Sequence, residues 1–222
     1  YTFEGKQYFL DINQKDENNA LHGLVYNKIF ELIDQKNTSE EAEVTLRYQE
    51  HMRTKGFPYT YTNDIKYTLT KDNLNFSVSV KNTDTKTFPF TMGWHPYFAS
   101  DDLFNSSVNF NSFKAVAFNK KNITIGLKDM SFNGEFKIEN KTLDDCFVLS
   151  SNEILFETPK YSFVLTSSEK DSFLQLYTPP HPNTIAIEPT TGISDSFNNG
   201  IGLKTLKPNE SYHITWNLKI HD

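Results

Sequence analysis

The sequence predicts an all-β protein, a large antiparallel β-sandwich formed by a single domain over residues 1–222. Apolar and polar side chains alternate in LNFSVSV (74–80) and again in YHITWNLKI (212–220). This period of two places one face of a strand in a core and the other face in water. No long segment repeats apolar residues at helical spacing, and turn residues recur between the apolar runs, as in a sandwich.

The expected elements are short strands joined by turns. The pair Glu4-Gly5 separates YTF from KQYFL, as a hairpin turn would. Shorter alternating runs predict further strands at 44–48 (VTLRY), 161–165 (YSFVL) and 173–177 (FLQLY). Later turns are predicted at Asn82-Thr83-Asp84, Asn133-Gly134 and Lys207-Pro208-Asn209.

Composition narrows the classes of function. Aromatic residues make up 14% of the chain and supply a sizeable core, although only 37% of residues are hydrophobic. The net charge of −6 argues against nucleic acid, which needs a basic stripe, and no apolar run is long enough to span a membrane. The single cysteine, Cys146, excludes an internal disulfide and a cysteine metal cluster. We expect a reducing, cytoplasmic location and a monomer or dimer.

Motifs for cofactors are missing from the sequence. It contains no Gly-rich phosphate loop, no His-Glu-X-X-His and no Gly-X-Ser-X-Gly. None of the six histidines has another at the second or fourth position along the chain, so a local metal pair is absent. We expect neither cofactor nor metal, although a metal site assembled from distant residues stays open.

Two segments carry the residues best suited to chemistry. In FPFTMGWHPYF (88–98), Pro96 favours extended backbone at His95, which is either a core histidine bonded to the backbone or a titratable group. In IAIEPTTGISDSFNNGIG (185–202), Glu188 follows an apolar run and is either paired structurally or tuned for proton transfer. Together they predict an acid/base pair that needs no metal or nucleotide.

Two weaker candidates accompany this pair. His22 in ALHGLVY precedes Gly23, where a sharp turn could present the imidazole, but it could also be an ordinary loop histidine. Asp144 and Asp145 open LDDCFVL, and adjacent strand residues face opposite ways, so only one of them can point into a site. The alternative for this pair is a solvated strand end.

The chain resembles the aldose 1-epimerase (galactose mutarotase-like) family in segments that come in the order of that family. These segments are LHGLVYNKIFEL, MGWHPYF, LDDCFVL, LQLYTPP, IAIEPTTGISDSFN and LKPNESYHITWNLKI. The resemblance implies a large antiparallel sandwich with an open sugar-binding groove on one sheet. It also implies a cofactor-independent isomerase that interconverts the α and β anomers of a free aldose of glucose or galactose type.

The resemblance also implies roles for single residues. His95 matches the general acid of the family, Glu188 its general base, and His22 its substrate-binding, transition-state-assisting histidine. Asp144 is the better match to a sugar-hydroxyl-binding aspartate, with Asp145 as the alternative after a shift of one. The apolar face of the sugar is expected to pack on two aromatic residues, Trp94 and Tyr177.

Two departures from the family pattern bear on these expectations. The family carries an arginine in an Asn-Arg segment just before the strand that YTFEGKQYFL matches, and this sequence starts after that point. We therefore expect the first strands of the sandwich and this arginine to lie upstream. The Leu-His-Gly-Gly pattern is reduced to Leu-His-Gly-Leu here, which predicts a divergent member and leaves the sugar open.

The expected mechanism is the opening of a hemiacetal ring. Glu188, as carboxylate, would take the proton of the anomeric hydroxyl, while His95, as imidazolium, would give one to the ring oxygen. The two groups are expected at opposite edges of the sugar. The neighbouring carboxylate is expected to raise the pKa of His95, and so to move the basic limb of the pH profile above the free-histidine value.

Two other functions stay open on the sequence alone. A hexose-6-phosphate mutarotase would need a cationic pocket, and the chain offers only Arg47, Arg53 and, after the His-Gly segment, Lys28. A non-catalytic carbohydrate-binding domain would keep the groove but would not need the pair of His95 and Glu188.

Overall fold

Strands form nearly all of the regular structure. The computed structural model describes residues 1–170 and 172–221, with all of their side chains except those of residues 131 and 133. The strands are β1 (Thr2–Phe3), β2 (Lys6–Gln7), β3 (Glu31–Asn37), β4 (Ala42–Glu50), β5 (Tyr61–Leu69), β6 (Asn73–Asn82), β7 (Phe88–Phe90), β8 (Tyr97–Ala99), β9 (Ser107–Phe118), β10 (Thr124–Lys137), β11 (Asp144–Leu149), β12 (Glu153–Glu157), β13 (Ser162–Ser167), β14 (Phe173–Tyr177), β15 (Thr184–Thr190), β16 (Lys204–Leu206) and β17 (Ser211–His221). The helical elements of the described chain are a 3-10 turn, Leu103–Asn105, and α1 (Ser196–Asn199).

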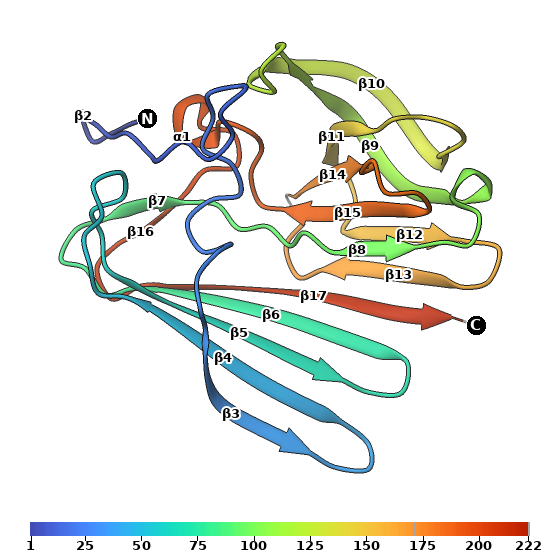
Figure 1. The fold of residues 1–222 in the computed structure, drawn as a ribbon, viewed down its shortest axis with the longest axis horizontal. Helices are drawn as coiled ribbons and strands as arrows, with labels where there is room; N and C mark the ends of the chain where they lie inside the picture. The colour runs from blue at the N-terminus through green and yellow to red at the C-terminus, as the bar shows by residue number, and fades with distance from the viewer. Residues whose placement is uncertain (171, 222) are drawn as a thin grey trace.

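One long antiparallel sheet dominates the fold. Its 13 strands run in the order β3-β4-β5-β6-β17-β13-β12-β9-β11-β14-β15-β8, with β10 paired to β9. Figure 1 shows β3 to β6 and β17 side by side in the lower half, and β9, β11, β14 and β15 in the upper half. The two small pairs, β1-β2 and β7-β16, complete the strands.

The sheet curves so that its far end returns over its middle. β8 ends the strand order, yet its Phe98 packs on Phe163 of β13 with ring centroids 4.4 Å apart. The segment before β8 does the same, because Trp94 stacks with Trp216 of β17 at 6.3 Å. One sheet therefore supplies both layers of a sandwich, and the predicted fold class is confirmed.

The main core lies between these layers. In β6, Phe76, Val78 and Val80 are buried and the serines between them are partly exposed, as a period of two requires. The largest fully buried side chains of this core include Trp216, Phe156, Phe163, Leu174 and Ile187. Each such side chain contributes about 1.5–3 kcal/mol of burial free energy, which makes the core the main source of stability.

Most sequence-based element predictions are confirmed. The five predicted strands correspond to β4, β6, β13, β14 and β17, and Glu4-Gly5 forms the hairpin turn between β1 and β2. The predicted turn at Asn133-Gly134 is wrong, since both residues lie within β10, opposite Asn111 and Phe110 of β9. The long neighbouring strand offers a continuous ladder, which outweighs the local turn preference. No helix in the described ranges is long and apolar enough to cross a membrane.

Candidate active site

His95 and Glu188 meet because the segment that holds His95 runs alongside β15. Within it, the N–H of Trp94 donates to the carbonyl oxygen of Pro189, and the carbonyl oxygen of Pro96 accepts from the N–H of Ile187. These bonds bracket His95 and place its Nε2 3.3 Å from Oε1 of Glu188. The structure thus brings together the two residues that the sequence singled out most strongly.

Burial sets the protonation of this pair. Glu188 is only 9% exposed and follows the fully buried Ile187. Burial, reinforced by the negative charge of Asp144, raises the pKa of Glu188 to about 8. Burial and the neighbouring His22 hold the pKa of His95 below its usual value. The expectation that Glu188 raises the pKa of His95 is therefore wrong, because Glu188 is still protonated, and so uncharged, where His95 titrates.

His22 reaches the same place from the loop before β3. Its backbone is left-handed, with φ of 65°, and Gly23 follows at 72°, so the chain turns sharply here. The side chain of Asn13 fixes the turn by bonding both the N–H and the carbonyl oxygen of Leu21. The His22 ring lies edge-on to the His95 ring, with centroids 5.3 Å apart.

A row of polar residues extends the site across three strands. Gln175 of β14 stands opposite Glu188 of β15 on one side and opposite Cys146 of β11 on the other. Asp144, two residues before Cys146 and on the same face, accepts a 2.8 Å hydrogen bond from Nε2 of Gln175. Asp145 alternates to the side of Phe147, which lies in the main core. The geometry therefore favours Asp144 over Asp145 as the residue directed toward Gln175 and the Glu188 strand.

The two predicted aromatic residues differ in placement. Tyr177 lies on the same face of β14 as Gln175 and directly opposite Asp144. Trp94 instead packs on Phe76 and Trp216 in the core. The prediction that Trp94 packs on a sugar ring does not fit this placement, because Trp94 and His95 are neighbours on an extended segment and face opposite ways.

Sequence reasoning missed three residues of this site. Tyr97 stacks on His95 at 5.0 Å and is half exposed, so it presents an aromatic surface beside His95. Gln175 links Asp144 to the Glu188 strand, and Asn122 donates a longer bond of 3.3 Å to Asp144. Alternation in FLQLY could have shown that Gln175 points away from the buried Leu174 and Leu176. The position of Asn122 could not have been found, because it depends on the packing of a distant turn.

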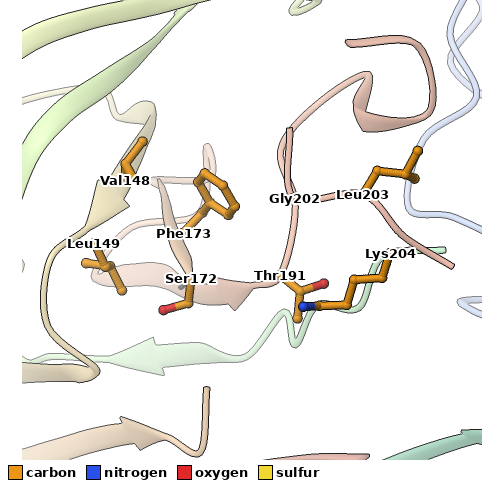
Figure 2. Close-up of a pocket in the computed structure, with 8 residues that line it drawn as sticks. All are labelled: Val148, Leu149, Ser172, Phe173, Thr191, Gly202, Leu203 and Lys204. Carbon is orange, nitrogen blue, oxygen red and sulfur yellow. The ribbon is translucent and has the colours of Figure 1, made fainter. Parts of the chain in front are cut away.

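A hollow of about 240 Å³ lies at the ends of β11 and β14 that are opposite to Asp144 and Tyr177. Figure 2 shows its lining, which consists of Val148, Leu149, Ser172, Phe173, Thr191, Gly202, Leu203 and Lys204. The lining includes none of the predicted site residues. Its one lysine, Lys204, is paired with Glu169 at 2.7 Å. The pair of His95 and Glu188 lies outside this hollow. In the described ranges, no group of three or more histidine, cysteine or acidic side chains is arranged to hold a metal ion.

The fold belongs to the class of galactose mutarotase-like sandwiches. A galactose mutarotase-like protein from Clostridium acetobutylicum superposes with a TM-score of 0.89 at 21% identity, over 100% of this chain and 75% of its own. The GalM/aldose epimerase homologue from C. elegans gives 0.79 at 17% identity, over 99% of this chain and 77% of its own. At these identities the likeness shows the fold alone.

Sequence comparison gives the family. The sequence model of aldose 1-epimerase matches residues 1–219, and the chain therefore belongs to the aldose 1-epimerase family. The uncharacterized protein YihR of Escherichia coli is 22% identical over 98% of this chain and 73% of its own length. The resemblance inferred from short segments of the sequence is thus confirmed over nearly the whole chain.

Proposed function

We propose that the protein is a mutarotase that interconverts the α and β anomers of a free aldose by opening and reclosing the ring. The observation that carries this proposal is the 3.3 Å contact between Nε2 of His95, which is exposed at the surface, and Oε1 of the buried Glu188. Membership of an isomerase family supports it, as does the polar row that leads from Glu188 to Asp144.

The close approach of the two groups suits the chemistry. The anomeric oxygen and the ring oxygen are bonded to the same carbon, C1, so a base at one and an acid at the other must be neighbours. Our expectation of groups at opposite edges of the sugar is replaced by this side-by-side arrangement. Glu188 takes the proton of the anomeric oxygen and His95 gives one to the ring oxygen, while the bond from C1 to the ring oxygen breaks. Rotation about C1–C2 and the reverse transfers complete the exchange.

The alternative of a hexose-6-phosphate mutarotase is less well supported. Arg47 makes a bidentate pair with Asp64, and Arg53 pairs with Asp84. The ammonium group of Lys28 lies over the ring of Tyr48, 5.7 Å from its centroid. The cations named from the sequence are thus engaged with partners other than His95 and Glu188. A binding domain without catalysis would not require that pair. We also propose a reducing, cytoplasmic location, which suits the buried free thiol of Cys146.

Polarimetry of freshly dissolved α-glucose and α-galactose, with and without protein, tests the proposal. We expect the protein to accelerate mutarotation, and His95→Asn and Glu188→Gln each to lower kcat by at least about a hundredfold. The exposed residues His213 and Glu153 provide matched controls, His213→Asn and Glu153→Gln, which should keep normal rates. Near-normal mutarotation by a well-folded His95 or Glu188 variant would remove that residue from the mechanism. Failure to accelerate either sugar would favour the binding domain.

A further inference from the structure

Carboxyl groups gather on one wall of the candidate sugar site. Asp144 begins β11, Glu188 lies two strands away in β15, and Glu17 approaches from the loop before β3. Asp145 follows Asp144 on the opposite face of β11. Glu17 and Asp145 are close enough to Asp144 for their negative charges to raise its pKa, together with burial. Asp144 in turn acts on Glu188 in the same way.

The loop that carries Glu17 is tied to this wall. Asn19 donates a 2.7 Å hydrogen bond to the carbonyl oxygen of Lys121, in the turn between β9 and β10. The next residue in that turn, Asn122, donates to Asp144. The closeness of Glu17 to Asp144 therefore follows from direct bonds between the loop, the turn and the strand.

No cation neutralises this wall in the parts of the chain that the structure describes. The donors to Asp144 are the neutral amides of Gln175 and Asn122. No ion pair within residues 1–170 and 172–221 joins Glu17, Asp144 or Asp145 to lysine or arginine. The basic groups of the site are the imidazoles of His22 and His95. The carboxylate of Asp144 is exposed and has only neutral donors, so it has unused acceptor positions and an uncompensated charge.

We propose that the site selects aldoses by charge, binding those that carry an ammonium group better than neutral ones of the same size and rejecting those that carry a carboxylate or phosphate. This inference rests on the proposed mutarotase function. An ammonium group in place of a hydroxyl keeps the size of the sugar and offers charged donors to Asp144, whereas an added anion meets the like charges of this wall. The charge of the wall is expected to determine which sugars bind. The opening of the ring at C1 is expected to be the same for all of them.

The test compares sugars of one size and different charge. The cationic probes are 2-amino-2-deoxyglucose and 6-amino-6-deoxyglucose, the neutral reference is glucose, and the anionic probes are glucuronate and glucose 6-phosphate. At about pH 6.5 an amine with a pKa near 7.7 is mostly protonated. For at least one amino sugar we expect kcat/KM, corrected for spontaneous mutarotation, to exceed that for glucose about tenfold, the low end for a hydrogen bond to a charged group. The kcat/KM for both anionic sugars should lie below that for glucose, and added salt should reduce the differences in kcat/KM between the sugars.

Variants test whether these carboxyl groups cause the preference for cationic sugars. Asp144→Asn should bring the ratio of amino sugar to glucose close to one, and Glu17→Gln should lower it partly. Asp129→Asn is the matched control, because it removes the same charge from a side chain that is 94% exposed on β10. The inference is overturned if neither amino sugar exceeds glucose, or if the ratio survives in Asp144→Asn. If no sugar reacts faster than spontaneously, it is the proposed function that fails.

Discussion

The mobile proton of the candidate site rests on Glu188 rather than on His95 when no sugar is bound at neutral pH, because burial raises one pKa to about 8 and lowers the other. This placement does not disable the pair. Ring opening uses one proton shared between two groups, and transfer across the 3.3 Å contact interchanges the neutral and ionic forms. The activity should therefore follow the number of protons on the pair, and the apparent pKa values belong to the pair as a whole.

The number of protons on the pair of His95 and Glu188 predicts the pH profile of kcat/KM. Below the lowered pKa of His95 the pair carries two protons, and above about 8 it carries none, so activity should be bell-shaped with its basic limb near pH 8. The limb lies above the free-histidine value, as expected from the sequence, but its cause is the raised pKa of Glu188 within the pair and not a raised pKa of His95. Stopped-flow polarimetry from about pH 5 to 10 measures it. A rate that stays level well past pH 9 would contradict the assignment of a shared proton.

The register of β11 predicts which aspartate binds sugar. Asp144 shares its face with Gln175, whereas Asp145 shares the face of Phe147. Asp144→Asn should raise KM about tenfold to a hundredfold, the cost of weakening a hydrogen bond to a charged group, while Asp145→Asn should change it little. Steady-state kinetics with the same sugar measure both variants. The opposite pattern would show that the register is shifted by one residue.

At this scale, the sequence could predict which side chains meet but not their protonation. The flanking Pro96 and the apolar run before Glu188 are local signals. The protonation depends on burial and on His22, which is distant along the chain. The sequence could also have predicted that Trp94 points away from the site. Neighbouring residues of an extended segment face opposite ways, which separates Trp94 from His95 as it separates Asp144 from Asp145.

At the scale of elements, the end of β15 is held by a close backbone approach. An added Cβ at Gly202 would lie 2.3 Å from the carbonyl oxygen of Thr191 and 2.6 Å from Cα of Gly192. Gly202 also has φ of 72°, which a side chain rarely adopts. The loop after α1 can therefore pack on the segment that follows Glu188 only with glycine at this position.

This contact predicts a large effect of Gly202→Ala on stability. Left-handed strain and overpacking together should cost about 2–4 kcal/mol, which corresponds to a loss of about 5–15 °C in Tm. Gly200→Ala is the matched control, because its φ is 76° but nothing lies within 4 Å of the added Cβ, so only the strain remains. Thermal unfolding measures both. Equal losses in the two variants would mean that the close approach contributes nothing.

Turn signals illustrate the limits of prediction for whole elements. Glu4-Gly5 forms its hairpin because, within the described part of the chain, each flanking strand pairs with the other alone. Asn133-Gly134 carries an equally strong signal but lies within β10, where β9 pairs with the strand on both sides of it. The sequence of a segment does not reveal whether a neighbouring strand is long enough to extend it.

At the scale of the whole molecule, alternation predicted an antiparallel sandwich, but not that one continuous sheet supplies both layers. The closure depends on contacts between residues far apart in sequence, such as Trp94 with Trp216 and Phe98 with Phe163. The sequence around each aromatic residue does not indicate which distant residue it contacts. The catalytic proposal depends on the same closure, because the segment that includes Trp94 also carries His95.

The closure predicts that residues 1–222 unfold as one domain. The two tryptophans, Trp94 and Trp216, stack across the core, so their fluorescence reports the joining of the layers, whereas far-UV circular dichroism reports the strands themselves. If the sheet and its closure are one cooperative unit, both probes should give the same midpoint in thermal or denaturant unfolding. Trp94→Phe, which leaves Trp216 as the only reporter, should retain this coincidence. A sugar that binds only the folded form should raise the unfolding midpoints from fluorescence and from circular dichroism by the same amount. A fluorescence change that precedes the loss of strand signal would show that the layers separate first, and that the contact of His95 with Glu188 can be lost while the strands persist.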